Sequence, residues 1–268
     1  MPAPRPGTRA HAREIAARLE RSQGHIPWRR RNDPVSELVT TLLSHSTTDV
    51  NQLRAFEALR SRYPTWDEVR AAPTAEVEKT VRVAGLAGQK APRIQHALDA
   101  IADDPRGDDL EWLGGLPLDE AMAFLTDLPG VGPKTAACVM CFCFDAAVVP
   151  ADTHVHRIAL RTRMVPPKAT AVRAQERLSR WIPPELTYAT HMHLIAHGRT
   201  ICFARSPVLE KPTTDGVVRP PSALGSTSGS PPVSTATAEF VVPRSMPIVL
   251  LMRCVLLSRT VPASGFEK

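Results

Sequence analysis

The chain has 268 residues, of which 43% are hydrophobic, and its 33 lysines and arginines outnumber its 27 acidic residues to give a net charge of +6. This size and composition suit a soluble globular protein of one or two domains. The five cysteines are an odd number, and the N-terminus carries charges where a secretory signal needs an apolar core, so we expect a reduced, cytoplasmic protein. The late apolar run 247–257 is short and contains Arg253, which argues against a membrane span.

Residues 8–200 read as successive amphipathic segments in which apolar residues recur at spacings of three and four. Thr65 and Thr74 stand where helix N-caps belong, and Gly85 and Gly88 mark stops. We find no convincing strand alternation, so the sequence predicts an all-α fold. The predicted helices lie in the segments 10–22, 34–46, 51–64, 74–85, 92–104, 118–128 and 134–144.

Charge is distributed unevenly along the chain. Residues 1–31 and 151–207 each carry a net charge of +6, whereas residues 32–150 carry −8 and residues 208–268 carry +2. Basic clusters are commonly no more than solvated surface. Two basic segments that fold together would nevertheless form a face that binds a polyanion.

The stretch LPGVGPKTAACV at 128–139 combines two glycines with a predicted helix start. Gly130 and Gly132 allow backbone angles and close approaches that other residues forbid, and Pro133 suits a first helical turn. The free amide groups of the helix that begins at Lys134 would attract an anion such as a nucleic-acid phosphate. Taken alone, a GxG pattern favours a tight turn between two helices.

Eighteen residues after Lys134, the segment PADTHVHRI places Asp152 ahead of another helical pattern. Aspartate is a favoured N-cap, which is a purely structural role. The helix N-terminus also favours the ionised carboxylate, so the same residue can serve in chemistry. The two roles are compatible.

With these two motifs the sequence resembles the endonuclease III family of helix-hairpin-helix/GPD DNA glycosylases. LPGVGPKTA matches the family's hairpin and catalytic lysine, PADTHVHRI matches its aspartate motif, and the resemblance extends from about residue 10 to residue 207. It implies two helical lobes: a barrel at 29–146 that carries the hairpin, and a second lobe formed by 1–28 with 147–207. The site would lie in the groove between them.

The resemblance implies a bifunctional DNA glycosylase and abasic-site lyase of base excision repair, acting as a monomer on oxidised pyrimidines in double-stranded DNA. In a bacterial-type cell this activity places the protein in the cytoplasm, at the nucleoid. Lys134 would attack C1′ of the damaged nucleoside as a free amine and form a Schiff base with the opened sugar. Asp152 would help deprotonate Lys134 and stabilise positive charge on the sugar.

Other segments match the family's DNA contacts. LLSHSTTDVNQ resembles the border of the lesion pocket, and VAGLAGQKA resembles the loop that inserts an apolar wedge, here Leu86, into the base stack. The family usually has alanine and glutamine where this chain has His45 and Ser46, which leaves the preferred lesion open. The DNA contacts that the resemblance implies are Gly130, Val131, Gly132, Leu86, Ser46, Asp49 and His154.

The resemblance also implies a [4Fe-4S] cluster held by four cysteines in the pattern C-x6-C-x2-C-x5-C. Cys202 occupies the first position, but Leu209, Pro212 and Val218 occupy the other three. One thiolate cannot hold such a cluster, so we expect it to be absent. The cysteines at 138, 141 and 143 are expected in the core.

Composition changes abruptly after Pro207, where the resemblance ends. Of the last 61 residues, 26 are Pro, Ser, Thr or Gly. We predict a disordered tail at 208–268 and suspect a frameshift in the gene or its recorded sequence.

Two other functions stay open at this point. A monofunctional adenine or thymine mismatch glycosylase is the nearest, although such enzymes usually lack lysine at the position of Lys134. A DNA-binding remnant without catalytic activity is the other, and the missing cysteines favour it.

Overall fold

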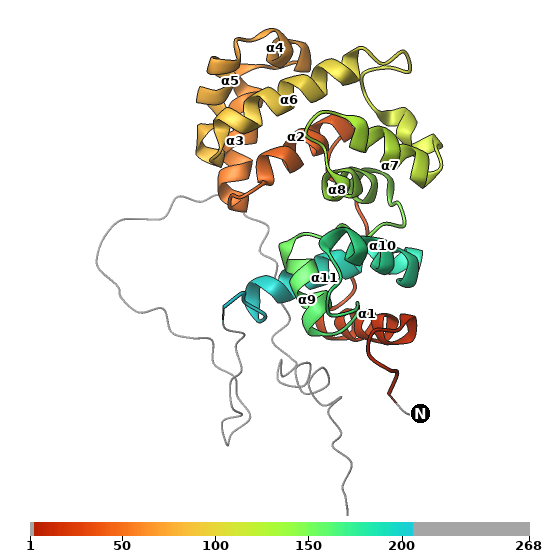
Figure 1. Cartoon of the computed structure of the whole chain (residues 1–268). Helices are drawn as coiled ribbons and strands as arrows, with labels where there is room; N and C mark the ends of the chain where they lie inside the picture. Colours follow the sequence, from red (N-terminus) through yellow and green to blue (C-terminus); the bar gives the residue numbers. More distant parts are fainter. Residues whose placement is uncertain (1–2, 206–268) are drawn as a thin grey trace, which may run out of the picture.

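The computed structural model describes residues 3–205, which form eleven α-helices and three short 3₁₀ helices (Figure 1). No strand occurs within this part of the chain, so the prediction of an all-α fold is confirmed. None of the helices in residues 3–205 is long and apolar enough to cross a membrane. The tail predicted at 208–268 lies outside the described residues.

Helices α2 to α8, with two 3₁₀ helices, form what we call the first lobe (Figure 1). Its elements are α2 (Pro34–Ser44), α3 (Asp49–Arg62), α4 (Trp66–Ala71), α5 (Thr74–Val81), η1 (Arg82–Ala84), α6 (Ala87–Ala102), η2 (Glu111–Gly115), α7 (Leu118–Asp127) and α8 (Pro133–Phe144).

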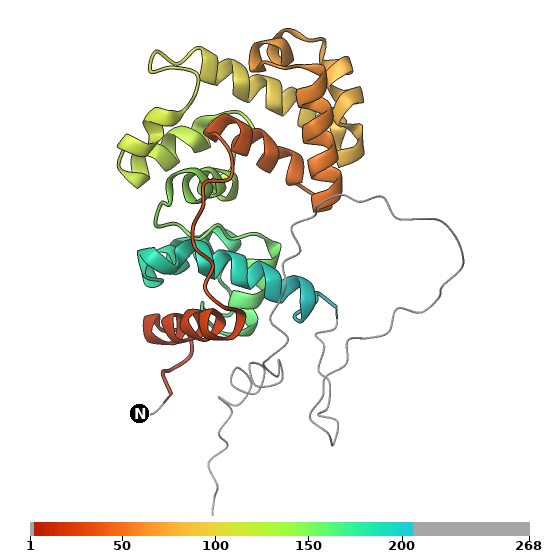
Figure 2. The ribbon, with the colours of Figure 1, turned by 180° about the vertical axis from the view of Figure 1, so that it is seen from behind.

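The N-terminal helix packs with the last helices in what we call the second lobe, and residues 24–33 connect the two lobes (Figure 2). Its elements are α1 (Arg9–Gln23), α9 (Thr153–Arg161), α10 (Ala171–Trp181), η3 (Pro184–Leu186) and α11 (Thr187–Thr200).

Each lobe has its own hydrophobic core. One cluster of buried residues extends from Val35 to Val148, and the other joins Ala12, Ile15, Ala16 and Leu19 to residues between 149 and 202. Burial of these apolar faces is the main force that holds each helix in place. The chain passes from one core to the other between α8 and α9, so the hairpin motif at the start of α8 precedes this passage and the aspartate motif lies at its end.

Helix α11 ties the two cores together. Tyr188 and Met192 pack against the first core, whereas Leu194 belongs to the second. The His191 ring lies 5.3 Å from the Phe142 ring between centroids, and its Nδ1–H donates to the carbonyl of Pro150 at 2.9 Å. The seam between the lobes therefore lies beside the start of α9.

Most predicted boundaries are correct, with two exceptions. Thr65 caps α4 by accepting from the Glu68 amide at 3.2 Å, as predicted. The expectation for Thr74 is wrong, because this residue opens α5 and its hydroxyl donates to Gln95 Oε1 at 2.7 Å instead. Gly88 is not a stop either, since α6 begins at Ala87, after Leu86, and continues through Pro92.

Candidate active site at the start of α8

The hairpin between α7 and α8 uses its two glycines differently. Gly130 has φ +79°, and a Cβ atom there would lie 2.9 Å from Cγ of Arg93. The fold therefore requires glycine at position 130. Gly132 is the N-cap of α8 with φ −100°, and a Cβ atom there would meet nothing within 4 Å. The fold alone does not require glycine at position 132.

Val131, between these glycines, faces inward. Its side chain is buried in the first core, and its amide donates to the carbonyl of Leu128 at 3.0 Å. The exposed residues of the hairpin are then Gly130 and Gly132, with Pro129 and Pro133 beside them.

Lys134 is the second residue of α8 and is partly buried. The pKa of His45 is lowered to about 4, first by burial and then by the Lys134 ammonium group. The same ammonium group acts on the buried carboxyl of Glu37, whose pKa burial raises, and on His191. Lys134 therefore lies among two neutral histidines and a buried carboxyl group.

Asp152 caps α9, as predicted, because its Oδ1 accepts from the Val155 amide at 2.7 Å. Burial lowers the pKa of His191 to about 4, and the charges of Asp152 and Lys134 act on that pKa in opposite directions. Both charges also act on the thiol of Cys138. The charges of Lys134 and Asp152 therefore both act on His191 and on Cys138.

One glutamine of α10 joins the backbones next to these two residues. Gln175 Nε2 donates to the carbonyl of Pro133 at 3.0 Å, and its Oε1 accepts from the Ala151 amide at 3.2 Å. One turn further along, the Ser179 hydroxyl donates to the Gln175 carbonyl at 2.7 Å and accepts from the Val149 amide at 2.9 Å. Sequence reasoning did not identify Gln175; its only local signal is a polar residue beside Ala174 and Leu178 on the buried face of α10.

The segment after α2 approaches Lys134 from the other side. His45 Nε2 shares a hydrogen bond of 3.3 Å with the Thr135 hydroxyl, and Ser46 is exposed with φ +52°. Lys90 anchors this segment, since its Nζ donates to the carbonyls of Leu43 and Ala84 at 2.8 Å each. Lys90 is buried, and this burial lowers its pKa.

Leu86 lies two residues after Ala84, whose carbonyl accepts one of the two hydrogen bonds of Lys90. It has φ +49° and is 51% exposed. A left-handed conformation is unfavourable for leucine, and so is exposure of its side chain to water. This combination is typical of a residue held for contact with another molecule.

Two further predicted DNA contacts pair with arginines. Asp49 at the start of α3 forms an ion pair with Arg199 of α11, with distances of 2.6 and 2.8 Å. His154 Nδ1 accepts from Arg157 Nη2 at 3.0 Å, and Arg157 also donates to the carbonyl of Gly198 at 2.9 Å.

The residues present do not fit an iron–sulfur cluster. The Cys202 thiol is buried and accepts a hydrogen bond from Arg161 Nη1 at 3.0 Å. The three positions expected to supply its partners, Leu209, Pro212 and Val218, lie outside the described residues and bear no thiol. The thiols of α8 lie in the first core, where burial raises the pKa of Cys143 to about 12. Within residues 3–205 no three His, Cys, Asp or Glu side chains are grouped to hold a metal.

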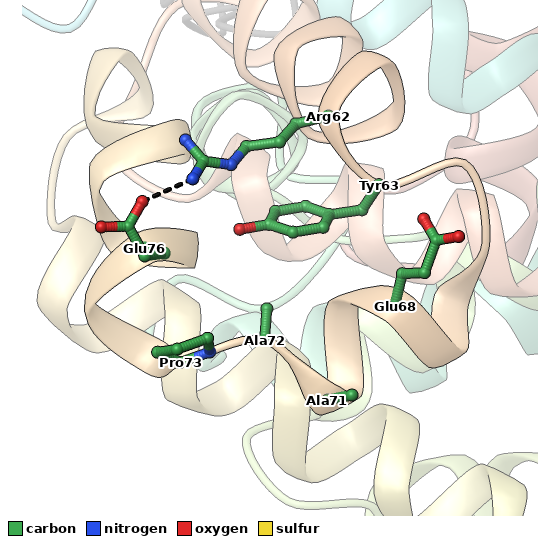
Figure 3. A pocket seen from close by; sticks show the side chains of 7 residues that line it. All are labelled: Arg62, Tyr63, Glu68, Ala71, Ala72, Pro73 and Glu76. Carbon is green, nitrogen blue, oxygen red and sulfur yellow. Dashed lines mark hydrogen bonds and ion pairs between the residues drawn. The ribbon is translucent and has the colours of Figure 1, made fainter.

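An open pocket lies elsewhere on the first lobe, around the end of α3, α4 and the start of α5 (Figure 3). Arg62 there forms an ion pair with Glu76 at 2.5 Å. None of the predicted site residues lines this pocket. Its lining consists of Arg62, Tyr63, Glu68, Ala71, Ala72, Pro73 and Glu76.

Comparison with known proteins identifies relatives of the chain. Residues 39–184 match the family model described as HhH-GPD superfamily base excision DNA repair protein. The chain is 30% identical over 200 residues to endonuclease III of Thermotoga maritima, covering 75% of this chain and 86% of that one. It is 37% identical over 175 residues to an Arabidopsis thaliana protein described as a candidate DNA glycosylase, covering 65% of this chain and 59% of that protein's length.

A solved structure agrees with these sequence matches. The trapped covalent intermediate of endonuclease III with DNA superposes with a TM-score of 0.64 at 29% identity, covering 75% of this chain and 91% of that one.

Proposed function

Because the chain belongs to the helix-hairpin-helix/GPD superfamily of base excision DNA repair proteins and to its endonuclease III family, we propose that it is a bifunctional glycosylase and abasic-site lyase. It is a DNA glycosylase of base excision repair. We further propose that oxidised pyrimidines in double-stranded DNA are its substrates and that Lys134 and Asp152 carry the chemistry. The observation that carries this proposal is that Gln175 hydrogen-bonds both to the carbonyl of Pro133, next to Lys134, and to the amide of Ala151, next to Asp152.

The surroundings of the lysines support Lys134 as the nucleophile. The described residues contain four lysines, and only Lys134 and Lys90 lie near the segment after α2. The Lys90 ammonium group is buried and committed to two backbone carbonyls. Lys134 is only partly buried, at the N-terminus of α8, and is therefore within reach of a ligand.

The proposed reaction begins when Lys134 gives up a proton to Asp152. The Nζ lone pair then attacks C1′, and the bond from C1′ to the base breaks, so the base departs with the electron pair and takes up a proton. Ring opening leaves an iminium ion between Nζ and C1′. Loss of a proton from C2′ then expels the 3′ phosphate and cuts the strand, and water releases the sugar fragment from Lys134.

Asp152 is well placed for its part in this reaction. Its Oδ1 accepts from the Val155 amide, so the carboxylate is held at the N-terminus of α9 and kept near the seam. A fixed carboxylate stabilises positive charge on the sugar without having to reorganise during the reaction.

The hairpin supports binding through the DNA backbone. Gly132 leaves the N-terminus of α8 bare, although its conformation would accept a side chain. A phosphate that approaches the amide groups of α8 supplies the reason for glycine there. The basic segments 1–31 and 151–207 both contribute to the second lobe, so positive charge gathers on one side of this site.

Leu86 supports a wedge role in the same proposal. A damaged base must leave the stack before its C1′ can be reached, and an apolar side chain can fill the gap without demanding hydrogen bonds. The exposed, left-handed Leu86 meets this requirement.

Borohydride trapping on abasic duplex DNA tests the proposal. The full chain should become covalently attached to the DNA, because only an amine forms the imine that borohydride reduces. Lys134→Gln should abolish attachment, and the control Lys168→Gln, at an exposed position of the second lobe, should leave it unchanged. If Lys134→Gln traps at the normal rate, the proposed nucleophile is wrong.

A thymine-glycol duplex tests the substrate class. The full chain should release the base and cut the strand. Base release with an intact strand would instead identify a monofunctional glycosylase, and tight binding without either reaction would identify a DNA-binding remnant.

A further inference from the structure

Gln175 occupies a position in the seam that no motif of the sequence marks. It lies on α10 of the second lobe, is only 6% exposed, and uses both ends of its amide group. One end donates to the carbonyl of Pro133, and the other accepts from the amide of Ala151. Pro133 directly precedes Lys134, and Ala151 directly precedes Asp152.

This bridge connects the two lobes at backbone groups adjacent to Lys134 and Asp152. Pro133 opens α8 of the first lobe, whereas Ala151 belongs to the loop that enters the second core. The Ala151 amide is buried and lies outside any helix, so it needs a partner from elsewhere in the chain. A glutamine side chain carries a donor and an acceptor on one planar group, which is what a carbonyl and an amide together require.

Its main chain is held as well. The Ser179 hydroxyl donates to the Gln175 carbonyl at 2.7 Å and accepts from the Val149 amide at 2.9 Å. The loop before Asp152 is thus fixed to α10 at two points, Val149 and Ala151. Only the second of these points also reaches α8.

We propose that Gln175 is a positioning residue that sets the spacing between the Lys134 amine and the Asp152 carboxylate by joining the backbone carbonyl of Pro133 to the backbone amide of Ala151. This proposal rests on the proposed function of the two residues. It goes further because it assigns the relative position of Lys134 and Asp152 to Gln175, which itself contacts neither the substrate nor the reacting atoms. Because proton transfer and attack depend on geometry, a shift of about 1 Å can slow a reaction by on the order of 10²-fold.

The test separates the chemical step from binding and from stability. Gln175→Met keeps the length of the side chain but loses both hydrogen bonds. Single-turnover imine formation on abasic duplex, measured by borohydride trapping, should slow by about 10- to 10²-fold. The Kd for the same duplex should change by less than about threefold, because the hairpin and the basic segments are intact.

Ser179→Ala is the matched control. It also deprives a loop amide, that of Val149, of its partner on α10, so its effect on Tm should resemble that of Gln175→Met. It leaves the bridge to Pro133 intact and should therefore trap within about threefold of the unaltered chain. Gln175→Asn provides a second variant, since its amide group is one methylene too short to reach both partners and it should also slow trapping.

Several outcomes would overturn the inference. A trapping rate for Gln175→Met within threefold of the unaltered chain would do so, as would a loss that appears in the Kd alone. If Ser179→Ala slows trapping as much as Gln175→Met does, the effect comes from loss of any contact between α10 and the loop, and not from the bridge to Pro133. Lys134→Gln, measured in parallel, keeps the two proposals apart: if it still traps, the proposed function fails, whereas its loss of trapping beside a normal Gln175→Met rejects only the role of Gln175.

Discussion

Arg199 near the end of α11 and Asp49 at the start of α3 form a two-point ion pair, with 2.6 Å between Nη1 and Oδ2 and 2.8 Å between Nη2 and Oδ1. The pair links the second lobe to the first on an exposed surface. Asp49 was predicted to contact DNA, and the structure gives its carboxylate an arginine that a phosphate could also bind. We therefore expect DNA to compete with Asp49 for Arg199.

Asp49→Asn should therefore tighten binding to undamaged duplex at low salt by about two- to tenfold, because it frees Arg199 and removes a negative charge. The exposed pair contributes only about 0.2–1 kcal/mol to stability, so the Tm should change little. A titration of labelled duplex at two salt concentrations measures the effect. Unchanged affinity for Asp49→Asn would mean that Arg199 does not reach the DNA.

Two variants of Asp152 distinguish its role as the N-cap of α9 from its proposed role in catalysis. Asp152→Asn keeps a good N-cap and should slow base removal by on the order of 10²–10³-fold while DNA binding persists. Asp152→Ala should lose the same activity and, in addition, about 1 kcal/mol of stability, because the Val155 amide loses its acceptor. Base-release rates and thermal unfolding of both variants provide the measurement. A normal rate for folded Asp152→Asn would reduce the residue to a helix cap.

Gly132 tests whether the hairpin binds phosphate. Since its φ is −100° and the space around a Cβ atom is empty, Gly132→Leu should fold normally. It should weaken binding to all duplexes by a similar factor of about tenfold, because phosphates rather than bases are contacted there. Gel-shift affinities on duplexes of unrelated sequence check this, with the Tm as control. Weakening that depends on sequence would instead point to base readout at the hairpin.

Some residues that shape the fold and the candidate site can be predicted from the sequence, and others cannot. Gly130, at a positive φ, and the N-cap at Asp152 act through local backbone geometry, so the sequence pattern predicts them. The prediction of an N-cap at Thr74 was wrong because the Thr74 hydroxyl donates to Gln95, 21 residues away, instead of accepting from the backbone of α5. Gln175 hydrogen-bonds to backbone groups 24 and 42 residues away, and Lys90 to one that is 47 residues away, which no local pattern reveals.

Two histidines of the site should make stability depend on pH. Burial lowers the pKa of His45 and His191 to about 4, whereas in the unfolded chain they titrate near 6.5. Between these values the unfolded state binds more protons than the folded state, so the free energy of unfolding falls as pH drops from about 6.5 to about 4. Both groups are neutral in either state at higher pH, and this contribution then vanishes.

The variant His45→Gln isolates one of the two contributions. Between pH 7 and pH 5 the free energy of unfolding of the variant should fall by about 2 kcal/mol less than that of the unaltered chain, because residue 45 no longer takes up a proton on unfolding. Urea unfolding at the two pH values measures the difference, and His96→Gln provides a control at an exposed histidine of α6. An unchanged difference between pH 7 and pH 5 would contradict the neutral, buried state of His45.

Iron content is where the family pattern and this chain disagree. Of the four cysteine positions in the family pattern, only the first, Cys202, is a cysteine in this chain. Its thiol accepts a hydrogen bond from Arg161. Arg161 also donates to the carbonyls of Phe203 and Ala204, the latter at 2.8 Å, so a guanidinium group organises the backbone after α11. A positive charge beside the sulfur does not replace three missing thiolates.

We therefore expect the purified 268-residue chain to contain well under four irons per molecule. Arg161→Met should destabilise the backbone just after α11 by about 1 kcal/mol, because the buried Cys202 thiol and two exposed backbone carbonyls lose their donor. Hydrogen exchange in the segment 195–205, compared with that of α8, measures this loss.

The frameshift hypothesis concerns residues outside the described range and makes a separate prediction: reading the coding DNA in another frame just beyond the codon for Pro207 should reveal C-x2-C-x5-C. Restoring that frame should bring back iron and sulfide and should raise the Tm, since a metal site that forms only in the folded state adds its binding free energy to folding. Four irons and four sulfides on the unaltered chain would contradict this account, because they would require ligands drawn from positions that the family pattern does not use.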